Sequence, residues 1–432
     1  MGSEAEVRRR AVLAATAGAA LEFYDFVTFS FFAIQIGDSF FPSNDRYVSL
    51  MGSLATFGAG FLSRPIGAHI LGGYADRVGR RPVMLLSMVI MGVAIGVLAL
   101  TPSYAVIGIA APVIAVAARL AQGFALGGEI GISTVYLLEA GDPKRRGFNT
   151  SLQGVAQLVA ATFGALVGLG LSSVLSAGQL SHFGWRIALL IGVSVAPLAL
   201  VLRRSLPETK DEPEPFVADD RAAGPSPRQA IVFGVLIMGA QTIANYVFNY
   251  TATFGQTQLH MSVQAAMAGQ VAANGIGIVT SLLGGWLCDR YGRRPLLLWP
   301  QLAFAALILP CFTWLLTART VFALISVNLV LNGVANLLNG PTQAAIAESL
   351  PRRGRSRAFA LIYALPVTLL GGTTQLFVTW LLKVSGAPIS LAWYLTVVQL
   401  IGLAAILAFP ESAPGKRGVA ENRRQGWRGS PP

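Results

Sequence analysis

The chain has 432 residues, of which 54% are apolar and only 12% are charged, and its mean hydropathy is +0.60. Soluble domains carry about 25% charged residues, so this composition excludes a soluble globule and indicates a membrane protein. The formal net charge is +12 at pH 7. The placement of the basic residues attributes this charge to membrane topology and not to nucleic-acid binding.

The predicted elements are long apolar runs. Crossing the hydrocarbon of a bilayer takes about 20 apolar residues per helix, and about twelve such runs follow one another along the chain. Lipid offers no hydrogen bonds to the backbone, so continuous runs of this length must be helices. We therefore predict an all-α membrane protein with twelve transmembrane helices. The first run lacks a small-residue cleavage site of the kind that ends a signal peptide, so we expect it to remain as helix 1.

Basic residues predict the orientation. They gather in the tails and in every second turn, for example "RRR" at 8–10, "KRR" at 144–146 and "RRGR" at 352–355. Loops rich in Lys and Arg stay on the cytoplasmic side of a membrane. We expect both termini to be cytoplasmic and the number of helices to be even, in a multi-pass protein of the bacterial inner (plasma) membrane.

Ionisable residues lie within three of the first four helices. Helix 1 holds Glu22 and Asp25, one turn apart, helix 2 holds Arg64, and helix 4 holds Arg119 and Glu129. A charged side chain inside a membrane helix is costly, so each of these needs a partner or a task. A carboxyl group whose surroundings change between two conformations can bind a proton in one and release it in the other.

Uncharged polar residues recur at helical spacing in later helices. Facing a cavity, amides and phenols can donate hydrogen bonds to carboxylate oxygens; otherwise they bond neighbouring helices. Lys383, near the external end of helix 11, either adds a fixed cation or extends to the membrane surface. The polar stripes are Gln153 and Gln157 in helix 5; Tyr246, Asn249, Tyr250 and Thr253 in helix 7; and Asn328, Asn332, Asn336 and Asn339 in helix 10.

One polar stretch occurs twice. "GGYADRVGRRP" at 72–82 and "GGWLCDRYGRRP" at 284–295 align without a gap when Asp76 is placed on Asp289. A chain of two six-helix halves, each with its own copy, explains the repeat. The polar segment that joins the halves is rich in Pro, Asp and Glu, so we expect it to be solvated. The predicted parts are a first half at 1–202, a cytoplasmic linker at 203–229, a second half at 230–410 and a cytoplasmic tail at 411–432.

Several of these stretches resemble a known family. "GGYADRVGRRP" resembles the signature loop between helices 2 and 3 of the major facilitator superfamily, and "RLAQGFALG" at 119–127 resembles its helix 4 motif. Within it, "ALEFYDF" at 20–26 and "RRGFNTSLQ" at 145–153 are similar to the metabolite:proton symporter family. "LLGGTTQLFVTWLLKVSG" at 369–386 resembles the citrate/tricarballylate branch. The resemblance implies the major facilitator fold, with two pseudo-symmetric halves of six helices.

The resemblance also implies a cytoplasmic gate. In the family, the repeated loop is taken to fasten the two halves together while the cavity faces outward. The alternative is that its arginines only set the topology. The gate residues carried over are Gly72, Asp76, Arg77, Gly79 and Arg80 in the first copy, and Asp289, Arg290 and Arg293 in the second.

Proton coupling and substrate binding are implied by the same resemblance. We expect Asp25 with Arg119 to handle the proton; the other interpretation is that these two form a permanent structural ion pair. Glu22 is an alternative proton carrier, and Glu129, further along helix 4, is another candidate. A polycarboxylate needs fixed cations, which Arg64, Arg119 and Lys383 can supply. The expected substrate-binding set is Arg64, Arg119, Tyr24, Gln153, Gln157, Tyr246, Asn249, Tyr250, Asn336, Asn339 and Lys383.

The function expected from the sequence is proton-coupled uptake of citrate or a related tricarboxylate. Open alternatives are another symported metabolite (2-oxoglutarate or another dicarboxylate, a shikimate-like aromatic acid, or proline or betaine), an exporter, and a membrane sensor. We expect no enzyme, because the chain has no nucleophile, metal or phosphate-binding constellation. Cys288 and Cys311 lack metal-type spacing. We expect no cofactor, no metal, no nucleic-acid partner and a working monomer in the lipid bilayer.

Overall fold

The computed structural model describes residue 16 and residues 23–24, 27–78, 80–140, 145–204, 227–350 and 355–408. Within these it gives the backbone alone at several places, including 72–73, 75–78, 80–81, 128–136 and 195–204. The described residues are almost entirely helical and contain no strand. Most of the predicted linker and all of the predicted tail lie outside the described residues, so the predicted boundaries of the parts remain predictions.

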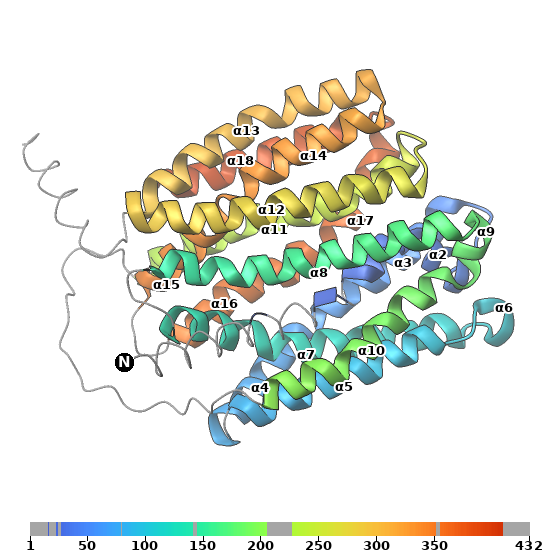
Figure 1. Ribbon diagram of the computed structural model, residues 1–432, viewed down its shortest axis with the longest axis horizontal. Helices are drawn as coiled ribbons and strands as arrows, with labels where there is room; N and C mark the ends of the chain where they lie inside the picture. Colours follow the sequence, from blue (N-terminus) through green and yellow to red (C-terminus); the bar gives the residue numbers. More distant parts are fainter. Residues whose placement is uncertain are drawn as a thin grey trace, which may run out of the picture.

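The first half consists of the elements from α2 to α10 (Figure 1). Ser63 separates α3 from α4 with helical backbone angles, so the two form one bent rod. Its hydroxyl donates to the carbonyl of Leu120, 2.6 Å away, and so bonds the bend to α7. The elements are α2 (Ala33–Phe40), α3 (Arg46–Leu62), α4 (Arg64–Val78), α5 (Arg80–Leu100), α6 (Tyr104–Ile107), α7 (Ala110–Ala140), α8 (Arg146–Val174), α9 (Ala177–Gln179), the π-helix η2 (Leu180–Gly184) and α10 (Trp185–Arg204).

The second half consists of the elements from α11 to α18. Gly292 joins α12 to α13 with φ +107°, a conformation that favours glycine and explains the glycine in "DRYGRRP". The elements are α11 (Pro227–Thr257), α12 (Val263–Tyr291), α13 (Arg293–Ala318), α14 (Val321–Asn336), α15 (Asn339–Ser349), α16 (Arg355–Pro366), the π-helix η3 (Val367–Gly371), α17 (Gly372–Ser385) and α18 (Ser390–Ala408).

Eight helical segments of the described chain are long and apolar enough to cross a membrane, and Leu85–Leu100 is a shorter apolar helix. Large apolar side chains remain exposed along these segments, among them Val93, Val279 and Trp299. Such a surface suits a lipid environment and would be a liability in water. An all-α membrane fold is therefore confirmed, while the count of twelve helices stays a prediction.

Glycine lets helices approach closely within the first half. A Cβ atom at Gly123 would collide with the carbonyl oxygen of Gly60, and one at Gly127 would collide with the carbonyl oxygen of Arg64. Close backbone contact of this kind is how small residues associate helices in lipid, where apolar side chains gain nothing from burial against one another. The α4–α7 contact fixes Arg64 and Arg119 relative to each other.

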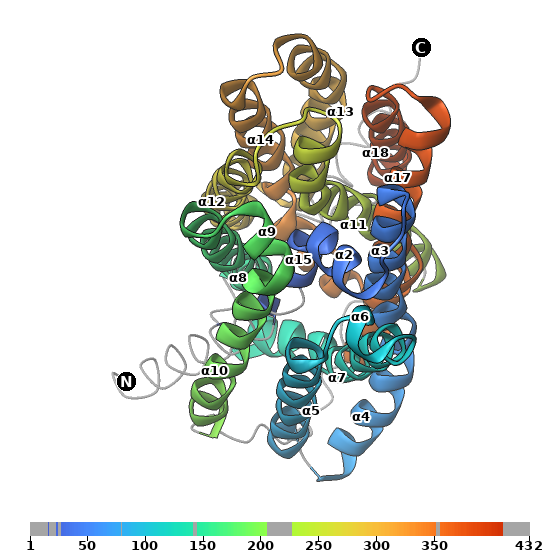
Figure 2. The same ribbon diagram turned by 90° about the vertical axis from the view of Figure 1, so that its right-hand side faces the viewer.

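Two helix pairs join the halves. Figure 2 shows α8 beside α12 on one flank of the molecule and α3 beside α17 on the other, and both pairs are in contact. The backbones almost touch in each pair: a Cβ at Gly285 would lie 2.7 Å from the carbonyl oxygen of Gly147, and one at Gly58 would lie 2.6 Å from that of Gly372. These pairs enclose the space between the halves.

Candidate functional site

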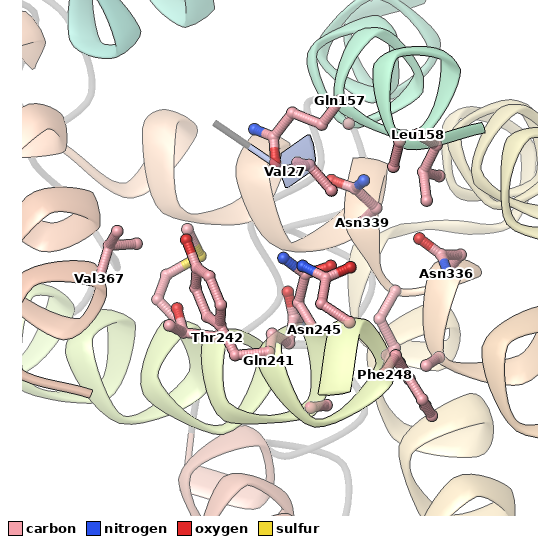
Figure 3. Close-up of a pocket in the computed structure, with 18 of the residues that line it drawn as sticks. Val27, Gln157, Leu158, Gln241, Thr242, Asn245, Phe248, Asn336, Asn339 and Val367 are labelled. Carbon is pink, nitrogen blue, oxygen red and sulfur yellow. The ribbon is translucent and has the colours of Figure 1, made fainter. Parts of the chain in front are cut away.

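A central cavity of about 130 Å³ lies between the halves, alongside the middle of α11. Arg64 is the one formally charged side chain among its described lining residues. Amides and phenols supply the other strong hydrogen-bonding groups of the wall, and Figure 3 shows several of them converging on the space. The cavity fits a small polar metabolite better than a drug-sized ligand, for which pockets of about 300–1,000 Å³ are usual. Its polar lining residues are Arg64, Gln157, Gln241, Thr242, Asn245, Tyr246, Asn249, Asn274, Asn336, Asn339, Gln343, Tyr363 and Gln399.

Arg64 is positioned at the start of α4, and only 3% of its surface is exposed. Its guanidinium carbon lies 4.2 Å from the ring centre of Phe61, and Tyr246 of α11 is within hydrogen-bonding reach. The contact with Phe61 holds the planar guanidinium from one side. Arg64 therefore extends from the first half to the second and presents a fixed cation to the cavity.

Amide side chains from both halves line the cavity. The Gln157 Nε2 atom on α8 donates to the hydroxyl oxygen of Tyr363 on α16, 3.2 Å away. Gln343 Nε2 donates to Asn339 Oδ1 at 2.7 Å, within α15. Six residues of the predicted binding set thus line this cavity: Arg64, Gln157, Tyr246, Asn249, Asn336 and Asn339.

Arg119 lies outside the cavity lining and is completely buried on α7. Its Nη1 atom donates to Gln122 Oε1 at 2.6 Å, and its guanidinium carbon lies 4.4 Å from the ring centre of Phe29 and 4.9 Å from that of Phe57. Phe57 also lines the cavity, so the ring of Phe57 contacts both the Arg119 guanidinium and the cavity. Glu22, Asp25 and the side chain of Glu129 lie outside the described residues.

Three further predicted binding residues are also absent from the cavity lining. Tyr24 donates its hydroxyl to the carbonyl of Ala188, 2.7 Å away on α10. Gln153, one turn before Gln157 on α8, is buried. Tyr250 accepts a hydrogen bond from the Thr379 hydroxyl at 2.9 Å. None of the three lines the central cavity, and Tyr250 lines a second hollow instead.

The asparagine stripe of the second half is divided. We expected four asparagines on one face of one helix, but α14 ends at Asn336 and α15 begins at Asn339. Asn328 Nδ2 donates to the carbonyl of Leu324, and Asn332 Nδ2 donates to Asn328 Oδ1 at 3.5 Å. Only Asn336 and Asn339 line the cavity. The first two bond within the helix bundle because buried amides satisfy one another in lipid.

Lys383 lies at the opposite end of the bundle from Arg290 and Arg294, in a second hollow of about 610 Å³ between the halves. We call this end, with Asp45, His260 and Lys383, the far end, and the end with Arg145, Arg290 and Arg294 the basic end. Lys383 Nζ is 3.3 Å from Asp45 Oδ2 and 3.8 Å from the ring centre of Tyr47. The hydrogen bond from the Tyr47 backbone N–H lowers the pKa of Asp45, and the hydrogen bond from Lys383 lowers it further. This pair joins α17 to the cap of α3.

The second copy of the repeated loop joins the halves at the basic end. The Asp289 carboxylate accepts hydrogen bonds from the backbone N–H groups of Gly147 at 2.8 Å and Phe148 at 2.9 Å, the first turn of α8. Arg293 pairs with Asp289 at 2.7 Å and with Glu348 at 2.9 Å. A carboxylate at a helix N-terminus satisfies N–H groups that have no partner within the helix.

The remaining gate residues are placed as follows. The guanidinium of Arg290 lies 5.8 Å from the ring centres of both Trp286 and Tyr291, its helix neighbours. Gly79 and the side-chain positions of Gly72, Asp76, Arg77 and Arg80 lie outside the described residues. Among the described residues, no three His, Cys, Asp or Glu side chains gather as a metal site would require.

The sequence interpretation missed several lining residues. Gln241 and Asn245 precede Asn249 at intervals of four on α11, so they share its face. That spacing was visible in the sequence, but the stripe through Tyr246, Tyr250 and Thr253 overlaps it. Gln343 follows Asn339 by four residues and Asn274 follows Gln270 by four, so these two also had a periodic signal. Tyr363 and Gln399 stand alone in apolar runs and had none.

Comparison with known proteins identifies the family. The chain is 36% identical over 400 residues to a citrate-proton symporter of Salmonella typhi, covering 91% of this chain and 92% of that protein. The chain belongs to the major facilitator superfamily. Within it, the chain is a member of the metabolite:proton symporter family, as its motifs predicted. The superfamily's own model matches residues 270–430, and that of the sugar (and other) transporters matches residues 11–211.

Other relatives of this superfamily member differ in their named substrates. A citrate-proton symporter of Klebsiella pneumoniae is 35% identical over 94% of this chain and 92% of its own length. The alpha-ketoglutarate permease of Escherichia coli (strain K12) is 30% identical over 96% of this chain and 97% of its own length. A solved structure of the proton:xylose symporter XylE superposes with a TM-score of 0.77 at 18% identity, covering 94% of this chain and 97% of that one, which confirms the fold.

Proposed function

We propose that the protein carries citrate or a related tricarboxylate into the cell together with protons, by alternating access. The observation that carries this proposal is the central cavity, in which the guanidinium of Arg64 faces amides and phenols of the other half. Guanidinium matches the geometry of a carboxylate in a bidentate fork, and amides add hydrogen bonds without further charge. The names of the two citrate-proton symporters at 35–36% identity support the same substrate class.

Another symported metabolite is the second candidate. The alpha-ketoglutarate permease of Escherichia coli favours a dicarboxylate. A shikimate-like aromatic acid, and proline or betaine, are the other alternative substrates, and the assay described below includes shikimate and glycine betaine. A zwitterion places one cationic group in the cavity, where Arg64 would repel it, so a carboxylate without a cationic group suits the described lining better.

For proton coupling we propose Asp25 with Arg119, and Glu22 and Glu129 as the other candidate carboxyls. Phe29, whose ring lies against the Arg119 guanidinium, follows Asp25 by four residues in the sequence. Residues four apart on a helix share a face. Phe57 contacts Arg119 and lines the cavity, so a ligand that binds in the cavity and displaces this ring also changes the surroundings of the Arg119 guanidinium.

For the transport cycle we propose that the basic end is cytoplasmic and that Asp289, Arg290 and Arg293 belong to its gate, with Gly72, Asp76, Arg77, Gly79 and Arg80 as the other copy. The contact of Asp289 with the first turn of α8 supports this role, because opening the basic end requires breaking it. Both halves also touch at the far end through Lys383 and Asp45. Alternating access then exchanges one set of contacts for the other.

The test is a liposome assay. The purified protein is reconstituted, and the internal pH is recorded after adding citrate, tricarballylate, succinate, 2-oxoglutarate, shikimate or glycine betaine. We expect citrate to acidify the lumen, and Asp25→Asn to abolish acidification. Protein-free liposomes and liposomes with a protonophore are the controls.

The outcomes separate the parts of the proposal. Acidification by 2-oxoglutarate but not by citrate would replace the substrate with a dicarboxylate. A response to betaine alone would overturn the carboxylate assignment. Uptake of labelled citrate without acidification, in parent and Asp25→Asn alike, would contradict proton coupling.

A further inference from the structure

Asn245 differs from its neighbours on α11. Its side chain is exposed, whereas Ala244 and Tyr246 on either side are buried. It lies 18 residues after Pro227 and 12 before Thr257, which places it about 27 Å and 18 Å from the two ends of the helix at ~1.5 Å per residue. An exposed side chain at that depth faces a cavity, and Asn245 lines the central one. Figure 3 shows it extending from α11 towards Asn339.

Asn245 also has no hydrogen-bond partner within the part of the chain that the structure describes. Other amides of the same wall are occupied: Gln157 bonds Tyr363, and Gln241 bonds the Thr342 hydroxyl. Asn249, one turn along the same face, likewise bonds no described group and lines the cavity. An uncommitted carboxamide inside a membrane protein is costly unless water or a ligand satisfies it.

Asn245 lines the same cavity as the fixed charge of the site. Tyr246, the next residue along α11, is within hydrogen-bonding reach of Arg64. Because Arg64 and Asn245 line the same small cavity, an acid held at one carboxylate by Arg64 can present a second polar group to Asn245. The carboxamide can donate to a carboxylate and accept from a hydroxyl.

We infer that Asn245, with Asn249 one turn further, contacts the transported ligand at its second polar group and so selects polycarboxylates over monocarboxylates and betaine. This inference rests on the proposed function. An amide built to meet a polar group of the ligand rejects an analogue that lacks it, because the amide is left unpaired. Asn245→Ala raises KM for citrate about 10- to 100-fold, the range expected for one lost polar contact, and leaves kcat within about threefold.

Accessibility gives a second readout that does not depend on turnover. In a background with Cys288→Ala and Cys311→Ala, Asn245→Cys is treated with a small water-soluble thiol reagent. We expect saturating citrate to slow its modification at least tenfold and glycine betaine to leave it unchanged. The matched control is Gln256→Cys on the same helix, which lines the far-end hollow, and we expect citrate to leave its modification unchanged. Gln256→Ala is the matched control for KM.

Each outcome bears on one claim. Equal modification of Asn245→Cys with and without citrate, in a background that still takes up citrate, overturns the inference and leaves the proposed function standing. Absence of modification in a folded variant means that the position is closed to the cavity and also overturns it. If Asn245→Cys does not fold, an unchanged KM for citrate in Asn245→Ala overturns the inference. Absence of uptake of any carboxylate by the parent overturns the proposed function itself.

Discussion

Replacing Asp289 by alanine tests the gate at the basic end. The carboxylate accepts two backbone hydrogen bonds from the first turn of α8, at 2.8 and 2.9 Å, and only 10% of the side chain is exposed. Arg293 keeps Glu348 as a partner after the change, so no charge is left buried and alone. The change then removes only the stabilising free energy of a charged helix cap, about 2–3 kcal/mol.

This loss acts on one conformation only. In the proposed gate, the contact of Asp289 with α8 joins the two halves, so it should stabilise the state in which the basic end is closed and be lost when that end opens. A change of about 2–3 kcal/mol shifts the ratio of open to closed molecules about 30- to 150-fold towards open. Asp289→Asn keeps one acceptor oxygen and should shift the ratio less.

Distances between spin labels measure the shift. Positions 74 on α4 and 291 on α12 carry exposed tyrosines near the basic end of each half. With both native cysteines replaced, labels at these positions should report a larger share of long distances in Asp289→Ala. The matched control is Asp45→Ala, which removes a helix cap and an ion pair at the far end. An unchanged distance distribution in a folded, transport-competent Asp289→Ala would refute the gate.

Three further changes test the packing, the site and the far end. Gly123→Ala brings a Cβ into collision with a carbonyl oxygen of α3 and should lower the midpoint of thermal unfolding. Gly96→Ala on α5 is the control: its Cβ meets nothing within 4 Å, and the gain of about 0.5–1 kcal/mol in helix propensity should raise the midpoint. Equal midpoints in the two variants would contradict the close approach at Gly123. Arg64→Lys keeps the charge but loses the bidentate fork, so KM for citrate should rise at least about tenfold, and an unchanged KM would exclude direct carboxylate binding. Lys383→Ala should alter uptake only slightly, because the pair with Asp45 is about half exposed. Because the pKa of Asp45 is lowered from its ordinary value of 3.8, the carboxylate stays charged and paired at any pH above that value, and the pair is lost only at a lower pH. The ratio of parent to variant uptake should therefore be the same at pH 5 and pH 7.

The cavity face of α11 shows where sequence reasoning stopped. The spacing indicated a polar helix and named Tyr246 and Asn249, which line the cavity, but it also named Tyr250, which lines the far-end hollow and bonds Thr379. It omitted Asn245. Helical periodicity tells which residues share a face and not which face meets a cavity. In lipid, a polar stripe can equally be satisfied by a neighbouring helix.

Charged positions were easier to predict, because a charge inside the membrane always needs an explanation. Arg64 stood out as a charged residue within helix 2, and it lines the cavity. Lys383 was assigned two interpretations, and its partner Asp45, 338 residues away in the sequence, could be found only from the fold. The same holds for Asp289, whose hydrogen bonds go to α8 in the other half.

The sequence by itself determined the membrane class, the all-helical architecture and the family, because composition, run length and the repeated loop are local properties of the chain. The tertiary structure decided which polar side chains meet at the cavity and which satisfy one another. Gln157 lines it, whereas Gln153, one turn earlier on the same helix, does not. Because residues four apart share a face of a helix, the two glutamines differ in their position along α8, and only the packing of the two halves decides how far the cavity reaches along that helix.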